Sequence, residues 1–473
     1  RDCLLSRGLG DVYKRQLYNS TIAAISTAMS NSGIGIVRMS GPEAFQIADR
    51  VYKGKKEKKL CDQKSHTIHY GYIVDGEQVI DEVLVMLMRG PHSYTGEDTV
   101  EINCHGGVYV VKRILELLIK NGARPAEPGE YTKRAFLNGR LDLSQAEAVG
   151  DLIASQNEYA LQSSVSQLKG NIKDKISEMR EKILYHTAFI ETALDDPEHI
   201  SVDGYGETLK KVVDEIMEAM KRLLDSCDDG RIIKEGVRTV ILGKPNAGKS
   251  SLLNVLLGED RAIVTDIAGT TRDVLEEHLN LKGISLNIMD TAGIRDTEDV
   301  VEKIGVDRAK EYADKADLIL YVIDASRPLD ENDAEILHLI KGKRAIILLN
   351  KSDLDMQVTK EQEELPEEFP VIEISAKNVQ GIEELEDTLK EMFFQGELTF
   401  NDEIYITNVR QKTALQDAYA ALERVNDSIA ADMPEDFYSI DLMDAYEALG
   451  NITGETIGED LVNEIFSKFC MGK

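Results

Sequence analysis

The segment Gly243-Lys-Pro-Asn-Ala-Gly-Lys-Ser250 matches the phosphate-binding pattern G-x-x-x-x-G-K-[ST]. Glycines in such a loop let backbone N–H groups wrap around phosphates, and the helix after the loop directs its positive end toward the anion. Lys249 is expected to bridge the β- and γ-phosphates as a catalytic group, and the Ser250 hydroxyl to bind Mg²⁺. The loop lies between an apolar stretch and the helical run SLLNVLLG. This order predicts a strand–loop–helix nucleotide site.

Three further motifs, in order along the chain, predict that the base is guanine. Asp290-Thr-Ala-Gly293 comes after an apolar stretch, where its aspartate orients a magnesium-bound water and its glycine senses the γ-phosphate. In Asn350-Lys-Ser-Asp353, the Asp353 carboxylate can accept from the ring N–H and the amino group of guanine, which adenine does not offer. The backbone of Ser375-Ala-Lys377 is placed to donate to guanine O6. The predicted GTP-binding residues are Asn246, Ala247, Gly248, Lys249, Ser250, Ser251, Thr265, Asp266, Ile267, Ala268, Gly269, Thr270, Thr271, Asp290, Thr291, Ala292, Gly293, Asn350, Lys351, Ser352, Asp353, Ser375, Ala376 and Lys377.

Residues 265–273, TDIAGTTRD, are predicted to form the switch that closes over the γ-phosphate. Thr271 is the preferred second Mg²⁺ ligand, and Thr270 is the alternative. The Asn246 side chain suggests a second cation site beside the phosphates, where a monovalent ion would supply the charge that an arginine finger gives elsewhere. Its other ligands would be the backbone carbonyls of Thr265, Ile267 and Thr270.

The water-orienting group for hydrolysis must differ from that of Ras-like GTPases, which carry a glutamine directly after D-x-x-G. That position is Ile294, which cannot orient water. Glu302 is the nearby candidate for this task, and Arg272 or Arg295 for charge stabilisation. A solvent-exposed surface charge is the alternative interpretation of each.

The elements around these motifs predict a multidomain chain of 473 residues. Residues 20–138 contain strand-like segments, an Asp75-Gly76 hairpin signal and a helical run that ends at Asn121-Gly122, which predicts an α+β N-terminal domain. Residues 236–395 alternate strands and helices as an α/β P-loop G domain. This domain is predicted to be inserted into an all-α helical domain formed by residues 139–235 and 396–473.

The helical pattern of residues 142–199 is broken at Pro197, and a second amphipathic helix comes after it. Its apolar stripe predicts helix-bundle core and consists of Leu209, Val212, Val213, Ile216, Met217, Met220, Leu223 and Leu224. Residues 1–19 are expected to be a non-native extension, because Arg1–Gln16 show no helical or strand periodicity that continues into the first strand-like segment at Thr21.

The composition restricts the partners of the chain. With 55 Lys and Arg against 85 Asp and Glu, the net charge is −30, which repels a nucleic-acid backbone over most of the surface. Contact with RNA must therefore use a local basic patch or be made mainly by a partner protein, and no DNA partner is expected. Five scattered cysteines and no run of 18 apolar residues favour a cytoplasmic protein without a membrane span.

Several long motifs resemble one family. The GTPase motifs are similar to the translation-associated branch that includes Era and Der. GIGIVRMSG, PHSYTGEDTVEINCHGG, PGEYTKRAFLNGRLDLSQAEAVGDLI and the terminal FCMGK resemble the MnmE (TrmE) family of tRNA modification GTPases, from about Ser20 to Lys473. The resemblance implies a homodimer that works with the FAD-dependent partner MnmG. Together they would add an aminomethyl or carboxymethylaminomethyl group to C5 of the wobble uridine (position 34) of certain tRNAs, using a tetrahydrofolate derivative of the 5-formyl or 5,10-methylene type.

The resemblance also implies roles for individual residues. It places K⁺ on Asn246, Thr265, Ile267 and Thr270, and Mg²⁺ on Ser250 and Thr271, and it makes Glu302 the switch glutamate. Folate contacts would fall on Arg38, Glu97, Arg140 and Lys473, with Arg140 standing where the family often has lysine. A carboxylate suits the aminopyrimidine edge of a pterin, and cations suit a glutamate tail. Cys470 is either a reactive thiol near the folate or a buried structural cysteine.

Two other functions fit parts of the sequence. A ribosome-assembly switch would use the same GTPase motifs, but it predicts a basic RNA-binding module where this chain has the acidic helical stretch DMPEDFYSIDLMDAYEALG. A folate-sensing regulator without chemistry of its own is harder to separate from the main interpretation, because the redox step belongs to the partner in both.

Overall fold

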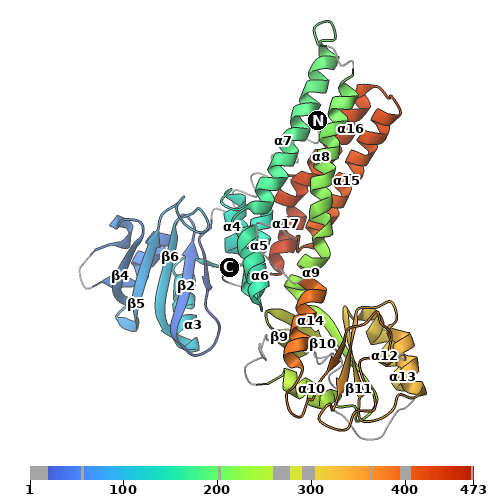
Figure 1. Ribbon diagram of the computed structural model, residues 1–473. Coiled ribbons are helices and arrows are strands. Elements are labelled where there is room, and N and C mark those ends of the chain that lie inside the picture. Colours follow the sequence, from blue (N-terminus) through green and yellow to red (C-terminus); the bar gives the residue numbers. More distant parts are fainter. Residues whose placement is uncertain are drawn as a thin grey trace. The chain divides into compact units, whose positions relative to one another are not determined.

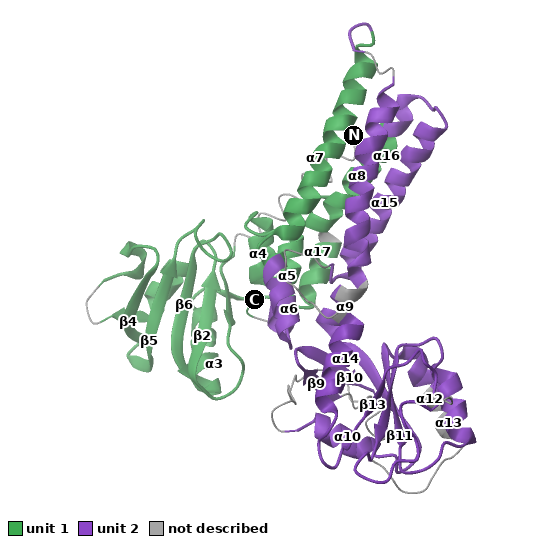
Figure 2. Ribbon diagram, in the orientation of Figure 1, with its two compact units in different colours: residues 1–150, 167–197, 439–473 green, residues 151–166, 198–438 purple. Residues whose placement is uncertain are grey.

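The computed structural model describes residues 20–54, 58–200, 204–258, 277–289, 304–362, 365–394, 406–456, 458–469 and 472. The chain forms two compact units, coloured separately in Figure 2. Unit 1 comprises residues 1–150, 167–197 and 439–473, and unit 2 comprises residues 151–166 and 198–438. Each unit is described by itself.

Unit 1 contains a seven-stranded sheet in the order β3-β4-β5-β6-β2-β1-β7. Its strand pairs are antiparallel except for β1 with β7. The predicted hairpin at Asp75-Gly76 is confirmed, since Gly76 adopts a φ of +63° between β4 and β5. The strands are β1 (Ile22–Ile25), β2 (Ser32–Ser40), β3 (Tyr52–Gly54), β4 (Thr67–Asp75), β5 (Gln78–Met88), β6 (Thr99–Gly106) and β7 (Arg124–Pro125).

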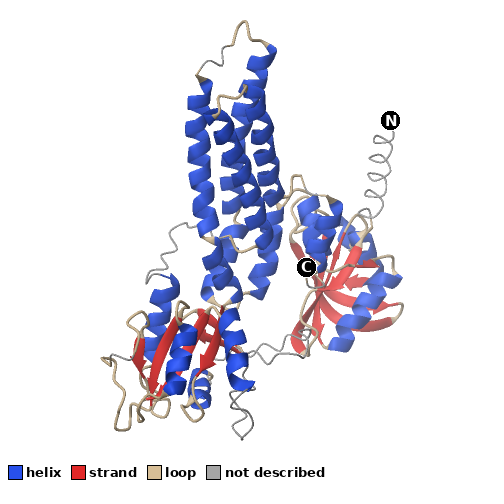
Figure 3. Cartoon of the chain, turned by 90° about the vertical axis from the view of Figure 1, so that its right-hand side faces the viewer, coloured by secondary structure: helices blue, strands red, loops and turns tan. Residues whose placement is uncertain are grey.

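Two amphipathic helices, α2 (Ala44–Val51) and α3 (Val108–Lys120), pack on this sheet (Figure 3). The core joins Val37, Val85 and Ile102 of the strands to Phe45 and Ile114 of the helices. As expected, α3 ends at Asn121-Gly122, where Gly122 takes a φ of +115°. A short 3₁₀ turn, η1 (Leu60–Asp62), precedes β4. Residues 20–138 therefore have the predicted α+β character.

The other helices of unit 1 are α4 (Glu130–Leu137), α5 (Leu143–Ala154) up to residue 150, α7 (Asn171–Asp195), α16 (Glu435–Thr453) from residue 439, and α17 (Glu459–Ser467). The rings of Phe136 and Phe466 join α4 to α17. Arg180 of α7 forms an ion pair with Glu455 and lies 4.1 Å from the ring centroid of Tyr446. Helices α4 and α7 thus pack with the C-terminal segment that contains α16 and α17. Helix α7 ends before Pro197, as predicted.

Unit 2 contains a six-stranded sheet in the order β13-β12-β11-β8-β10-β9. Every pair is parallel except β10 with β9, which agrees with the α/β G domain predicted from the sequence. The strands are β8 (Val237–Leu242), β9 (Glu277–Leu281), β10 (Ile284–Ile288), β11 (Leu318–Asp324), β12 (Ala345–Asn350) and β13 (Val371–Glu373). Helices α10 (Lys249–Leu256) and α14 (Ile382–Phe394) share one core with the sheet. Helices α12 (Ile304–Lys315) and α13 (Glu331–Ile340) share another.

The remaining helices of unit 2 are α6 (Glu158–Leu168) up to residue 166, α8 (Tyr205–Asp225), α9 (Cys227–Glu235) and α15 (Val409–Ala430). Helix α8 lies along α15 (Figure 1), and the amide of Asn426 donates to Asp214 between them. The expected stripe on α8 is confirmed at its centre, where Leu209, Val213, Ile216, Met220 and Leu223 are buried; Val212, Met217 and Leu224 are half-buried.

The two compact units divide the chain differently from the predicted domains, because parts of the expected helical domain fall in each unit. The predicted boundaries at residues 20–138, 139–235, 236–395 and 396–473 remain a prediction. Within the described residues, no helix has the length and apolarity needed to cross a membrane.

Candidate functional site

The predicted phosphate-binding loop connects β8 to α10. Gly243 has a φ of +150°, and a Cβ there would lie 2.4 Å from the carbonyl oxygen of Val322. Gly248 has a φ of +99°, and a Cβ there would lie 2.1 Å from Nδ2 of Asn350. Only glycine fits both positions, because a side chain would push the loop away from the strands. The loop therefore fits a phosphate chain, which backbone N–H groups at a helix N-terminus attract.

Lys249 is the first residue of α10, and its ammonium group is held inside the loop. Nζ donates to the carbonyl oxygens of Gly243 at 2.6 Å and Lys244 at 2.9 Å. Burial lowers the pKa of Lys249. Neutral carbonyls are weaker partners for an ammonium than phosphate oxygens, so the side chain is ready to move to a polyphosphate. Ser250 is the next residue in the first turn, and its hydroxyl oxygen is a suitable Mg²⁺ ligand.

Asn350, at the end of β12, connects the phosphate-binding loop to the predicted guanine site. Its Nδ2 donates to the carbonyl oxygen of Ala247 at 2.8 Å, and its Oδ1 accepts from the backbone N–H of Ala376 at 3.1 Å. The Ser375 hydroxyl donates to Asp353 Oδ1 at 2.7 Å. Three motifs that lie far apart in the sequence therefore meet at the carboxyl ends of the parallel strands.

Lys351 takes a φ of +66° between Asn350 and Asp353, and its Nζ donates to Asp324 Oδ2 at 2.6 Å. Burial raises the pKa of Asp324, but hydrogen bonds from Lys351 and Ser326 outweigh it, so this pKa lies below its ordinary value. The aspartate at the end of β11 therefore fixes the turn that presents Asp353. The predicted residues Ser251 and Lys377 are exposed.

Lys244, inside the phosphate-binding loop, has partners that the sequence did not reveal. Its Nζ donates to Asp333 Oδ2 at 2.6 Å and to Asp330 Oδ2 at 2.9 Å, at the start of α13. Asp330 and Asp333 form the capping box of α13, and the buried hydroxyl of Tyr321 donates to Asp333 at 2.7 Å. This ion pair anchors the loop that supplies two carbonyls to Lys249.

The switch lies outside the described residues. This applies to the expected GTP, Mg²⁺ and K⁺ ligands in residues 265–271 and 290–293, and to the candidates for hydrolysis, Arg272, Arg295 and Glu302. Cys470 and Lys473 also lie outside them. Of the predicted K⁺ ligands, Asn246 is described; it is exposed in the loop at a φ of +64°.

Two of the predicted folate residues meet at one aromatic ring in unit 1. The guanidinium carbon of Arg38, on β2, lies 5.8 Å from the ring centroid of Tyr94, and that of Arg140 lies 4.9 Å from it. Arg38 also donates from Nε to Glu101 Oε1 at 2.7 Å. The ring of Tyr94, which the sequence did not single out, thus gathers two cations suited to an anionic ligand.

The end of the chain comes to the same place. The carbonyl oxygen of Gly472 accepts from the Ser26 hydroxyl at 3.2 Å and from Arg38 Nη1 at 3.5 Å. A Cβ on Gly472 would lie 2.3 Å from the carbonyl oxygen of Ile25, so this close approach to β1 requires glycine. The predicted folate residue Lys473 is the next residue.

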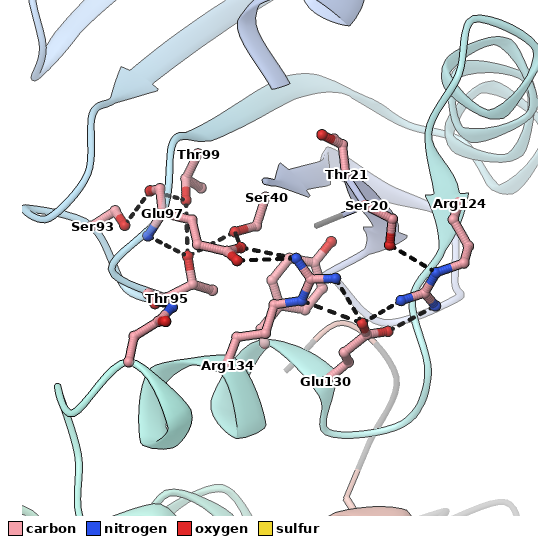
Figure 4. A network of polar contacts seen from close by, with 12 residues as sticks. Ser20, Thr21, Ser40, Ser93, Thr95, Glu97, Thr99, Arg124, Glu130 and Arg134 are labelled. Carbon is pink, nitrogen blue, oxygen red and sulfur yellow. Dashed lines mark hydrogen bonds and ion pairs between the residues drawn. The ribbon is translucent and has the colours of Figure 1, made fainter. Parts of the chain in front are cut away.

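Glu97 belongs to a network of polar contacts that Figure 4 shows from close by. Its Oε2 accepts from the Ser40 hydroxyl at 2.8 Å and from Arg134 Nη1 at 3.0 Å, while Arg134 Nη1 lies 3.2 Å from Oε1. The Ser40 hydroxyl also lies 2.7 Å from that of Thr95. The carboxylate is therefore held in one orientation, with 19% of its side chain exposed.

Arg134 is 1% exposed and lies between two carboxylates, those of Glu97 and Glu130. Its Nη2 donates to Glu130 Oε1 at 2.9 Å. On its other side Glu130 is bound by Arg124, with Nη2–Oε1 at 2.5 Å and Nη1–Oε2 at 3.1 Å (Figure 4). Two cations thus neutralise two carboxylates, and a fixed, partly exposed carboxylate at Glu97 suits the N–H groups of an aminopyrimidine.

The chain is similar to known proteins over nearly its whole length. The family model described as the TrmE N-terminus matches residues 21–140, and the model described as the MnmE helical domain matches residues 143–470. The tRNA modification GTPase MnmE of Lachnoclostridium phytofermentans is 58% identical over 454 residues, which cover 96% of this chain and 99% of that protein. The proteins of the same name from Acetivibrio thermocellus and Clostridioides difficile are 52% and 49% identical at the same coverage.

Among solved structures, Aquifex aeolicus Era bound to GDP and AlF4⁻ is 31% identical over 39% of this chain and 66% of its own, with a TM-score of 0.26. A score this low carries no argument about the fold, which rests on the sheet topology and the family models.

Proposed function

Because this chain belongs to the MnmE (TrmE) family of tRNA modification GTPases, we propose that it couples GTP hydrolysis to the modification of the wobble uridine of certain tRNAs at C5. The family relationship carries the activity, since the identity extends over nearly the whole of both chains. The side chain of Asn350 carries the assignment of the nucleotide site, because it binds both the phosphate-binding loop and the guanine segment.

The described residues support distinct roles in binding GTP. The loop from Gly243 to Ser250 would hold the phosphates with its N–H groups, and Lys249 would leave the loop carbonyls for the phosphate oxygens. Asp353 would accept the two N–H groups of guanine, and its hydrogen bond with Ser375 keeps the carboxylate oriented. Ser250 and Thr271 would bind Mg²⁺, which supplies positive charge to the phosphates.

Hydrolysis needs a group that orients water, and Glu302 is our candidate because Ile294 cannot do so. We also assign a K⁺ site to Asn246 with the carbonyls of Thr265, Ile267 and Thr270. The structure of the described residues supports this site because Asn246 is exposed within the phosphate-binding loop. K⁺ there would supply charge near the phosphates in place of an arginine.

Unit 1 is assigned the folate site. Glu97 would accept from the pterin, and Arg38, Arg140 and Lys473 would bind the glutamate tail of a tetrahydrofolate of the 5-formyl or 5,10-methylene type. The shared ring of Tyr94 and the position of Gly472 support this grouping. MnmE proteins act with MnmG on tRNA, so the FAD-dependent step would belong to MnmG, and this chain would act as a homodimer.

Mass spectrometry of nucleosides from cellular tRNA tests the proposal. Deletion of the gene should remove C5-aminomethyl-type wobble uridines, and wild type should restore them. Lys249→Ala should not restore them, whereas the control Lys221→Ala, an exposed lysine on α8, should. Unchanged uridines after deletion would contradict the role in tRNA modification and would favour ribosome assembly.

A further inference from the structure

A short segment of unit 1 has a charge opposite to that of the whole chain. Residues 53–64 contain six lysines, of which the structure describes Lys53, Lys58, Lys59 and Lys64, all exposed. Residues 20–140 contain 16 Lys and Arg against 14 Asp and Glu, although the chain as a whole has a net charge of −30. We call the four described lysines, on β3 and around η1, the lysine turn.

The backbone from Leu60 to Gln63 is fixed by two half-buried side chains. Asp49, on α2, accepts from the backbone N–H of Leu60 at 2.5 Å and of Cys61 at 3.1 Å. Arg89 donates from Nη2 to the carbonyl oxygens of Cys61 at 2.5 Å and Gln63 at 3.2 Å. Lys58, Lys59 and Lys64, which flank this backbone, are therefore presented on an ordered turn, so a polyanion would not have to order it on binding.

Within the part of the chain that the structure describes, the lysine turn keeps a net positive charge beside Asp49 and Asp62. Among the described residues, none of its four ammonium groups forms an ion pair with a carboxylate, and Arg89 behind them donates to backbone carbonyls. Many other lysines do form such pairs, including Lys120, Lys175, Lys182, Lys210, Lys282, Lys315, Lys343, Lys360 and Lys468. Asp62 is exposed on the same turn and subtracts one charge.

Aromatic rings on the neighbouring strand lie beside one of the lysines, Lys53. Lys53 pairs with Tyr72 across β3 and β4, and the ring of Tyr72 lies 6.2 Å from that of Tyr70, in an edge-to-face arrangement. Tyr70 is 41% exposed. Burial and then the charge of Lys58 lower the pKa of His69, which places Lys58 near β4 as well. His69 points to the opposite face of β4 from Tyr70 and Tyr72, so Lys53 is the lysine beside these rings. A cation beside an exposed aromatic ring suits a nucleic acid, whose phosphates are anionic and whose bases can stack.

We propose that the lysine turn binds the phosphate backbone of tRNA. This inference rests on the proposed function, which makes tRNA the substrate, and it adds the surface by which this acidic chain contacts it. The electrostatic contribution is independent of sequence and falls with salt, because each neutralised phosphate releases bound counterions.

The test compares wild type with the triple variant Lys58→Gln, Lys59→Gln and Lys64→Gln as full-length proteins. Binding of fluorescently labelled tRNA is measured by anisotropy between 50 and 200 mM salt. The logarithm of the association constant falls with the logarithm of the salt concentration, with a slope of about −0.9 per phosphate contact on a duplex. Loss of three contacts should therefore reduce the magnitude of this slope by about 2.7. Over this fourfold change in salt, wild type should therefore lose about 40-fold more affinity than the variant.

A control variant with the same loss of charge is Lys173→Gln, Lys211→Gln and Lys221→Gln, three exposed lysines on α7 and α8. It should keep the wild-type salt slope, and all three proteins should keep basal GTP hydrolysis. Equal slopes for both triple variants, or no binding of tRNA to wild type alone at 50 mM salt, would overturn the proposal and assign the contact to another surface or to the partner. The failure of the modification function itself would appear separately, in the cellular nucleosides.

Discussion

Replacing Arg134 by methionine tests whether the network around Glu97 is organised as described. The change removes a cation that is 1% exposed and lies between two carboxylates. Glu130 would keep Arg124 and the backbone N–H of Glu127, whereas Glu97 would keep only the Ser40 hydroxyl among these partners. The energetic loss therefore falls mainly on Glu97.

The size of the effect can be worked out from this difference. Removing one partner of a buried ion pair costs about 3–5 kcal/mol, and the partial exposure of Glu97 places the expected loss near the lower limit, about 3 kcal/mol. For a cooperative unit of roughly 200 residues, 1 kcal/mol corresponds to about 2–4 °C, so the melting temperature of unit 1 should fall by about 6–12 °C. Adding Glu97→Gln to Arg134→Met removes the unpaired charge and should recover about 1–2 kcal/mol.

Differential scanning calorimetry of the full chain is the appropriate assay, because the protein has no tryptophan to report unfolding by fluorescence. Arg113→Met is the matched control, since the Arg113 side chain is 36% exposed and its ion pairs with Asp75 and Glu116 are 3.8 and 3.5 Å long; it should cost less than about 1 kcal/mol. Titration with 5-formyltetrahydrofolate should show weaker binding for Arg134→Met and for Glu97→Gln, with little further loss in the double variant. A melting temperature of Arg134→Met that falls by less than about 2 °C would refute the reasoning, and so would additive effects of the two changes on folate affinity.

Four further predictions concern the G domain. Asp353→Asn should weaken GTP binding and reduce the preference for guanine, which competition titrations with other nucleotides measure; unchanged selectivity would remove Asp353 from the base site. Glu302→Ala should slow hydrolysis without lowering GTP affinity, and replacing K⁺ by Na⁺ at fixed ionic strength should lower wild-type turnover; normal rates in either experiment would argue against the corresponding role. Burial raises the pKa of Asp317, but hydrogen bonds from Arg238 and Arg231 outweigh it and bring this pKa to about 2. Because this value is below the ordinary 3.8, the stabilisation, roughly 2 kcal/mol, is complete above about pH 4 and is lost as the pH falls toward 2. The stability difference between wild type and Asp317→Asn should therefore shrink over that range in acid unfolding, and a constant difference would count against the ion pair.

The sequence predicted best those features that local pattern determines. The apolar stripe of α8, the hairpin at Asp75-Gly76 and the strand–loop–helix around Gly243 are all encoded by neighbouring residues. The short strands β3, β7 and β9 were not predicted. The few residues of β3 and β7 become strands only through pairing with distant partners, whereas β9 is a five-residue strand that pairs with the next strand, β10, across Lys282-Gly283.

The supporting charges of the sites were not predictable for the same reason. Lys244 looks like a solvent-exposed loop lysine in the sequence, yet its partners Asp330 and Asp333 lie 86 and 89 residues away. Arg134 reaches Glu97 over 37 residues, and Gly472 reaches Arg38 over 434 residues. A resemblance to a family places candidate residues at positions, but it does not name the side chains that hold them.

The chain enters and leaves the inserted GTPase core at nearly one point. Gly230, in α9, has no room for a side chain because a Cβ would lie 2.3 Å from the carbonyl oxygen of Ile406, and the backbone N–H of Ile406 approaches the Ser226 hydroxyl at 3.3 Å. A domain whose two ends lie side by side can be gained or lost as one piece without separating the segments that flank it. The same geometry leads us to expect that a short linker between the flanking segments, at Gly230 and Ile406, can replace the G domain and leave α8 and α15 to pack as before.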